Sequence, residues 1–345
     1  MSGWQVIGQS RVVSLLQRSL DKGVLAHAYL FIGPTHVGKM TLALNLAQAL
    51  NCEESEKPCG ECLSCQKITK GKYADVQIIG LDYASEAEEL KNRTEIGIDQ
   101  IRQLQHSASL PPFEGKYKIF IIDGAELLSI EAANCLLKTL EEPAGKVVFL
   151  LLTTNIGLLP DTVVSRCQQL ELIPLSSDEV ENALTNKWGI ETQKAKLLSR
   201  LCHGCLGWAL SASLGDELLK EYRGRRDNIL DIINTGYEER FSYVAQLAVQ
   251  FSKRRESVQE ILDIWLDFWR DLLLIKTDLA EAINNVDIEK TLTDLARGFS
   301  LAEIKTFISS IQAAKQQLKQ NANPRLVLEV LMLNMPERKR ERVRS

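Results

Sequence analysis

A chain of 345 residues, 45% of them apolar and 25% charged, has the composition of a globular protein and is too long for one ordinary core. Its 41 basic and 45 acidic residues give a net charge of -4, which excludes a uniformly basic nucleic-acid-binding protein. No apolar run reaches the length of a membrane span, and the N-terminus lacks a basic-then-apolar signal pattern. We therefore expect two or three domains, a cytoplasmic location, no membrane partner and reduced thiols.

The first motif in chain order is a phosphate-binding loop. After a helical lead-in over residues 1–26, the pattern predicts a buried strand at 28–32 and a helix at 41–50. Between them, Gly33-Pro-Thr-His-Val-Gly-Lys-Met40 fits G-x-x-x-x-G-K-S/T except at its last place. Two glycines would let backbone N–H groups surround a phosphate at a helix N-terminus, and Lys39 would reach the β- and γ-phosphates. The alternative is a glycine-containing turn without a ligand.

The last place of this motif decides whether the nucleotide is hydrolysed. A Ser or Thr hydroxyl would ligate Mg²⁺ there, and Met40 has none. Thr41 lies about 100° further around the helix and is a poor substitute. We therefore expect weak ATP or ADP binding, a doubtful Mg²⁺ and negligible hydrolysis. The expected nucleotide contacts are Gly33, Gly38, Lys39, Thr41, Asp123 and Thr153.

Four clustered cysteines follow the loop and its helix. Cys52, Cys59, Cys62 and Cys65 have the spacing C-x6-C-x2-C-x2-C. Four thiolates close a tetrahedral site around Zn²⁺ and leave no position for water, so the spacing predicts a structural zinc knuckle. The alternatives are a redox pair or unrelated free thiols. The remaining cysteines are scattered and are predicted to be core thiols: Cys135, Cys167, Cys202 and Cys205.

Further strands are predicted at 76–79, 118–123, 147–153 and 169–172, alternating with helices, which indicates a parallel sheet covered on both faces. Asp123 ends the second of these strands, where P-loop proteins place a carboxylate near Mg²⁺. Its alternative role is a cap or turn residue. In the hydrolysing AAA+ pattern a glutamate that polarises the attacking water follows this aspartate, but here Gly124 does. Glu126 lies two residues further on, and we expect its carboxylate to point away from that place.

Helices dominate the rest of the chain. Ser129 is predicted to cap a helix whose apolar face is Ile130, Ala133, Leu137 and Leu140. Strand patterns end at Ser176, which forms a capping-box pattern with Glu179. Residues 218–334 are helical by pattern, with Trp265 and Trp269 in a core or interface. The end of the chain is basic and is predicted to be a disordered tail.

Several stretches resemble one family, the delta-prime subunits of the bacterial DNA polymerase III clamp loader. The resemblance is dense over 1–172 and thinner to about 335, and the combination LLKTLEEP with a downstream SRC is specific for it. The stretches that carry it, besides the cysteine cluster, are His27–Pro34, Tyr117–Asp123, Ala132–Pro143, Ser165–Cys167 and Asn321–Arg325.

The resemblance implies α/β and all-α parts. They are an AAA+ P-loop domain at 1–173 with a zinc insertion at 52–65, a helical lid at 174–215, a helical collar at 218–335 and a basic tail at 336–345. It also implies a five-membered ring with gamma/tau and delta subunits, which loads the sliding clamp onto primed DNA. Within that ring Arg166 would be an arginine finger for the neighbouring subunit, and Thr153 would occupy the sensor-1 place. The sensor-2 arginine is not evident in Gly207–Leu210.

The chain thus lacks hydrolytic groups at positions 40 and 124 and near Trp208, but retains the arginine that acts on a neighbour. This asymmetry favours a delta-prime-like subunit that is not itself an active ATPase. One alternative is an ATP-hydrolysing gamma/tau-type motor subunit of the same loader. Another is an unrelated zinc-dependent AAA+ adaptor with no role in replication.

Overall fold

A computed structural model of the chain describes residues 3–81, 83, 94–142, 145–253, 255–320 and 322–338. Within it the chain forms two compact units. The first is Met1–Glu179 with Gly204–Trp208, and the second is Val180–His203 with Ala209–Ser345. The expected lid and collar borders remain predictions, and from residue 339 onward the expected tail lies outside the described residues.

A five-stranded parallel sheet forms the centre of the first unit, as predicted. Its order is β2-β3-β4-β1-β5. The register pairs Ile32 of β1 with Thr153 of β4, and Asp123 of β3 with Leu152 of β4, so the carboxyl ends of three adjacent strands share one edge. The strands are Ala28–Ile32 (β1), Val76–Ile79 (β2), Lys118–Asp123 (β3), Val147–Thr153 (β4) and Gln168–Glu171 (β5).

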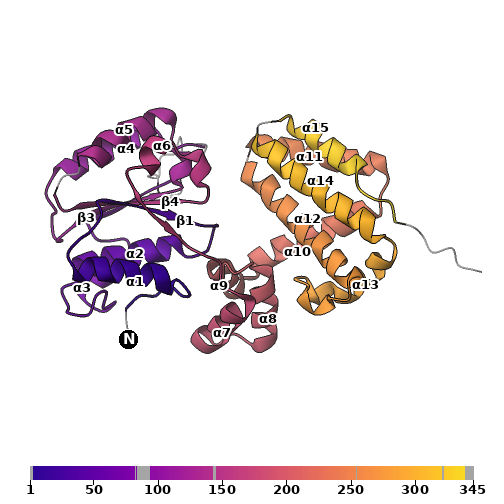
Figure 1. Ribbon diagram of the computed structural model, residues 1–345, viewed down its shortest axis with the longest axis horizontal. Coiled ribbons are helices and arrows are strands. Elements are labelled where there is room, and N and C mark those ends of the chain that lie inside the picture. The colour runs from indigo at the N-terminus through magenta and orange to yellow at the C-terminus, as the bar shows by residue number, and fades with distance from the viewer. Residues whose placement is uncertain are drawn as a thin grey trace, which may run out of the picture. The chain divides into compact units, whose positions relative to one another are not determined.

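Helices cover both faces of this sheet (Figure 1). Successive side chains of β1 point to opposite faces, so both faces are apolar and each packs in its own cluster. Tyr29 and Phe31 pack on the side of α1–α3, whereas Ala28 and Leu30 pack on the side of α4–α6. The helices are α1 (Ser10–Asp21), α2 (Lys39–Asn51), α3 (Leu63–Thr69), α4 (Ile98–Ser109), α5 (Ile130–Glu141) and α6 (Asp161–Val164). Short 3-10 helices, η2 (Ala125–Leu127) and η3 (Ile156–Leu158), follow β3 and β4.

The cap predicted for α5 is confirmed, and so is its predicted apolar face at Ala133, Leu137 and Leu140, but not at Ile130. The N–H group of Ala132 donates to Ser129 Oγ at 3.1 Å. Ile130 is 75% exposed, and the helix buries Ala132 and Leu136 in addition to Ala133 and Leu140. Spacings of three and four residues allow a wider apolar face than the four residues predicted, and this face packs against α4.

The second unit is helical in its described part, and its helices pack around aromatic side chains. Trp265 and Trp269 are fully buried, as predicted for a core, and the ring of Trp269 lies 4.6 Å from that of Phe307. None of the described helices combines the length and apolar composition that crossing a bilayer requires. The helices are α7 (Ser177–Trp188), α8 (Thr192–Leu201), α9 (Leu206–Leu214), α10 (Asp216–Ile233), α11 (Tyr237–Lys253), α12 (Arg255–Lys276), η4 (Ala280–Ala282), η5 (Val286–Ile288), α13 (Glu289–Arg297), α14 (Leu301–Lys319) and α15 (Pro324–Leu333), with α7 and α9 beginning in the first unit.

The capping box predicted at the start of α7 is also confirmed. The N–H group of Glu179 donates to Ser176 Oγ at 3.3 Å, and the N–H group of Ser176 donates to Glu179 Oε2 at 2.9 Å. These reciprocal bonds satisfy backbone donors that a helix N-terminus otherwise leaves unpaired. They stabilise the start of α7, the first helix after the last strand of the sheet.

Candidate functional site

The loop between β1 and α2 holds the phosphate-binding motif in a tight backbone turn. The N–H group of Gly33 donates to the carbonyl oxygen of Thr153 at 3.1 Å, which ties the start of the loop to β4. Gly38 has a φ of 109°, which a residue with a side chain would adopt only with strain. His36 is also left-handed, with a φ of 63°. The loop therefore ends at the N-terminus of α2, where the helix dipole favours an anion.

Lys39 is the first residue of α2 and is only 8% exposed. Its Nζ donates to the carbonyl oxygens of Gly33 at 2.6 Å and Pro34 at 2.8 Å. Burial lowers the pKa of Lys39, while the carboxylates of Glu126 and Asp123 act to raise it. The ammonium group is thus bonded by the backbone of its own loop, and a phosphate would have to replace these two carbonyls.

The two residues after Lys39 offer no well-placed hydroxyl for Mg²⁺. Met40 is partly buried and packs against the apolar cluster on the α1–α3 side of the sheet. Thr41 is on the exposed surface of α2. The place of the metal-ligating hydroxyl in a hydrolysing P-loop protein is therefore taken here by an apolar side chain that packs on the cluster.

Glu126 lies close enough to Lys39 to act on its pKa, and its carboxylate is bonded to the end of β4. Its Oε1 accepts from the N–H group of Thr154 at 2.9 Å and also from the hydroxyl of Thr154. Its Oε2 is buried and has no hydrogen-bond partner among the described residues. Gly124 has a φ of 74°, and this left-handed residue lets the chain turn into η2 directly after β3. The turn returns Glu126 to the end of β4.

Thr153, expected at the sensor-1 place, is fully buried at the end of β4. Its hydroxyl oxygen accepts from the N–H group of Asn155 at 3.1 Å, and its carbonyl oxygen accepts from Gly33. Thr153 and Asp123 therefore lie on adjacent strands at the edge of the sheet where the phosphate loop begins.

A second segment packs on the phosphate loop, which we did not predict. The N–H group of Gly207 donates to the carbonyl oxygen of His36 at 3.0 Å, and a Cβ at position 207 would lie 2.8 Å from that oxygen. Burial raises the pKa of Cys205, and the nearby Lys39 acts to lower it. The two glycines in Gly204–Trp208 are the only sequence signal for this close approach. The segment contains no arginine that could serve as sensor 2.

Arg166 follows α6, and its hydrogen-bond partners differ from those of Lys39. Its Nη2 forms an ion pair with Glu141 Oε1, and its Nη1 donates to the carbonyl oxygen of Thr162 at 2.9 Å. The Arg166 side chain is 33% exposed. Among the described residues it makes no hydrogen bond or ion pair to the phosphate loop of its own chain.

The four predicted cysteine ligands meet at one point, and the predicted proximity is confirmed. Their four Sγ atoms all lie within 4.8 Å of one another, with Cys52 to Cys62 and Cys59 to Cys65 each at 3.9 Å. Zn–S bonds of about 2.3 Å in a tetrahedron place sulfurs roughly 3.8 Å apart, so the set fits a metal ion and is too widely spaced for disulfides.

Backbone N–H groups also point at these sulfurs, as expected for thiolates. The N–H group of Cys62 donates to Cys59 Sγ at 3.3 Å and that of Glu61 at 3.4 Å, and these bonds, with those of the neighbouring thiols, lower the pKa of the Cys59 thiol to about 7. The N–H group of Cys65 donates to Cys62 Sγ at 3.5 Å, at the start of α3. The cluster can therefore hold a metal ion through four thiolates. It lies beyond the end of α2, about 20 Å along the helix from Lys39.

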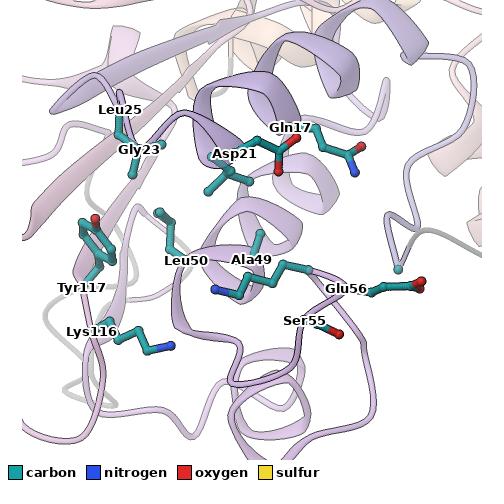
Figure 2. Close-up of a pocket in the computed structure, with 13 residues that line it drawn as sticks. Gln17, Asp21, Gly23, Leu25, Ala49, Leu50, Ser55, Glu56, Lys116 and Tyr117 are labelled. Carbon is teal, nitrogen blue, oxygen red and sulfur yellow. The ribbon is translucent and has the colours of Figure 1, made fainter.

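A cavity of about 750 Å³ lies at this same end of α2 (Figure 2). Its lining includes Asp21 at the end of α1, Leu50 near the end of α2, and Tyr117. Two acidic residues, Asp21 and Glu56, balance two basic ones, Lys57 and Lys116. With this balance, and with the C-termini of two helices nearby, the cavity does not favour a phosphate.

The sheet order, the phosphate loop between β1 and α2 and the carboxylate at the end of β3 define a protein of the AAA+ P-loop class. The chain belongs to the DNA polymerase III delta-subunit family. The family model described as "DNA polymerase III, delta subunit" matches residues 8–176, and that described as "DNA polymerase III, delta subunit, C terminal" matches residues 225–337.

The chain is also similar to individual proteins. DNA polymerase III subunit delta' of Bacillus subtilis is 29% identical, over 95% of this chain and 96% of its own length. Subunit tau of the same organism is also 29% identical, over 96% of this chain, which spans only 60% of tau. A gamma-subunit-related protein from Thermotoga maritima, known as a crystal structure, has a TM-score of 0.46 and 19% identity, covering 95% of this chain and 99% of that chain.

Proposed function

We propose that this chain is a delta-prime-type subunit of a DNA polymerase III clamp loader. In this role it does not hydrolyse ATP, and Arg166 acts on the nucleotide of a neighbouring subunit. Gamma/tau and delta subunits complete a five-membered ring in the cytoplasm, which loads the sliding clamp onto primed DNA. The likeness to a delta' subunit along nearly the whole of both chains supports the assignment.

The observation that carries the proposal is the contrast between Lys39 and Arg166. Lys39 is bonded to two carbonyl oxygens of its own loop, beside Met40. Gly124 replaces the glutamate that would polarise an attacking water. Arg166 keeps part of its guanidinium at the surface. A chain with this arrangement gains little from an arginine aimed at its own site, whereas a neighbour's transferring phosphoryl group is stabilised by it.

The test is ATP hydrolysis by the isolated chain and by the reconstituted loader. We expect the isolated chain to bind nucleotide weakly and without dependence on Mg²⁺, and to show negligible turnover. Addition of the chain to motor and delta subunits should restore clamp loading on primed DNA. A loader that works equally well without the chain would refute the proposal.

A motor-type subunit is the second candidate, because a relative named tau is as similar as the one named delta'. It is also supported by Lys39 at the start of α2 and by Asp123 and Thr153 at the ends of β3 and β4. Turnover near the typical ~10 s⁻¹ by the isolated chain, lost in Lys39→Ala, would favour this candidate.

We also propose that the four cysteines hold one structural Zn²⁺. The spacing of the four sulfur atoms supports this, and four thiolate ligands are typical of a structural zinc site. Structural zinc supplies about 10–16 kcal/mol of apparent binding energy in peptides, so metal loss should unfold this insertion. Elemental analysis of anaerobically purified protein should find one zinc per chain, and a metal-free, folded protein would refute the site.

A further inference from the structure

We propose that Glu141 is a latch that holds Arg166 against its own subunit and thereby keeps basal ATP hydrolysis by the neighbouring subunit low. The inference rests on the proposed function, because it assigns Arg166 to the neighbour's nucleotide. Glu141 is a positioning residue in this proposal. It contacts the arginine and not the reacting atoms.

The contacts of Arg166 show a guanidinium folded back onto α6 and the end of α5. Nη2 is paired with Glu141 at the end of α5, and Nη1 donates to the carbonyl oxygen of Thr162 in α6. Nη1 also lies 3.5 Å from the hydroxyl of Ser165. Donors held by these partners cannot bind a phosphate at the same moment. Arg166 must leave Glu141, or share it, in order to serve a neighbour.

The position of Glu141 explains why the pair forms. Glu141 is the last residue of α5, where the negative end of the helix dipole disfavours a carboxylate. The cationic side chain of Arg166 offsets this repulsion. The carboxylate of Glu141 is therefore better stabilised with Arg166 nearby than without it.

The exposure of the two side chains makes the pair reversible. Arg166 is 33% exposed and Glu141 is 50% exposed, so water screens their attraction. Pairs of this kind shift an equilibrium by only about two- to fivefold. A polyphosphate in a partly shielded site carries more charge and binds the planar guanidinium fork more strongly. The latch therefore holds the arginine at rest and yields when a loaded neighbour approaches.

The adjacent residue supplies a matched control. Glu142 is exposed and, among the described residues, has no ion pair. Glu142→Gln removes the same charge one residue further along without touching Arg166. Glu141→Asp keeps the latch charge on a side chain one methylene shorter.

The experiment measures ATP hydrolysis without DNA by the complete reconstituted loader, after size-exclusion has shown that each variant assembles. We expect Glu141→Gln to raise kcat about two- to fivefold with KM for ATP unchanged, because Glu141 does not touch the nucleotide. Glu142→Gln should match the unmutated loader, and Glu141→Asp should lie closer to it than Glu141→Gln does. In an Arg166→Ala background, Glu141→Gln should have no further effect.

Each outcome separates the latch from the underlying function. If Arg166→Ala alone hydrolyses ATP at the unmutated rate, the proposed trans role itself fails. If Arg166→Ala is impaired but Glu141→Gln behaves as Glu142→Gln does, only the latch fails. A decrease with Glu141→Gln would show that Glu141 holds Arg166 in its working position and would also overturn the latch.

Discussion

The phosphate loop and the segment around Arg166 each hold one cationic side chain. The two side chains differ in their burial and in the charge of their partners. Lys39 is buried and donates to two carbonyl oxygens of its own loop. Arg166 is partly exposed and paired with a carboxylate at the end of another helix. Neutral carbonyls inside a tight turn hold Lys39 inward, whereas a screened ion pair leaves Arg166 exchangeable.

The difference shows how a P-loop fold can lose one function and keep another. The loop needs Gly33 and Gly38 for its backbone shape whether or not a nucleotide binds. Lys39 retains a structural task after Met40 has removed the metal-binding hydroxyl. Arg166 needs only a stable α6 and a surface position.

The largest effect is expected at Arg166. Arg166→Ala should leave folding and ring assembly intact and lower turnover at the neighbouring site by about 10³-fold, since arginine fingers contribute about 10³–10⁵ in rate. Arg166→Lys should restore activity only partly, because an ammonium group lacks the planar fork. The measurement is DNA-stimulated ATPase of rings shown to be complete. Full activity of the alanine ring would make Arg166 an ordinary surface residue and remove the contrast with Lys39.

The next effect concerns the stability of the loop. Lys39→Met should lower the free energy of unfolding by about 1–3 kcal/mol, because two carbonyl oxygens lose a charged donor. ATP hydrolysis by the assembled ring should not change. Urea unfolding measures the loss, and Lys138→Met, on the exposed surface of α5, is the control. Unchanged stability with a loss of ring activity would show that Lys39 serves a nucleotide and not its own loop.

Local sequence patterns predicted much of this contrast. The strands at 76–79, 118–123 and 147–153 were correct in their bounds, because continuous apolar runs between turns are typical of a doubly covered parallel sheet. The cysteine cluster was predictable because its ligands lie within one short segment. The position of Lys39 and Met40 at the start of a helix was likewise predictable from the spacing of the motif alone.

Contacts made by turns and by distant segments could not be predicted in this way. Glu126 reaches Thr154 only because Gly124 adopts a left-handed conformation. Gly204–Trp208 returns to the first unit after two helices of the second, and no local pattern specifies that return. The partner of Arg166 was also missed, since an ion pair between α5 and the end of α6 depends on how these helices pack.

Glu126 is predicted to weaken phosphate binding, and removing its charge should have a smaller effect than the changes at Arg166 and Lys39. Its carboxylate contributes negative charge beside Lys39, with one buried oxygen unpartnered among the described residues. Glu126→Gln keeps an acceptor for the N–H group of Thr154 and removes the charge. Affinity of the isolated chain for ATP without Mg²⁺ should rise a few-fold, on the order of 1 kcal/mol. Titration with a fluorescent ATP analogue measures this, with Glu142→Gln as the control. Weaker binding would indicate that Glu126 helps to hold the nucleotide.

The smallest effect is a pH dependence of stability at Lys39. Burial lowers the pKa of this lysine in the folded chain, whereas in the unfolded chain it is near 10.4. Between the lowered pKa and about 10.4 the unfolded chain holds a proton that the folded chain has released. Stability therefore rises with pH in this window, and the total gain is about 1.4 kcal/mol for each unit by which folding lowers the pKa.

The Lys39→Met variant has no titrating group at this position. Comparison with it therefore isolates the contribution of Lys39 to the pH dependence of stability. From pH 8 to about 10.4 the unmutated protein should gain stability relative to Lys39→Met, as measured by urea unfolding at each pH. The direction is informative in itself, because a lysine held mainly by the carboxylates of Glu126 and Asp123 would have a raised pKa and would lose stability as the pH rises. A relative gain supports the burial of Lys39 inside its own loop. Parallel pH profiles would show that the ammonium group is solvated, and that the two cationic side chains differ less than their contacts indicate.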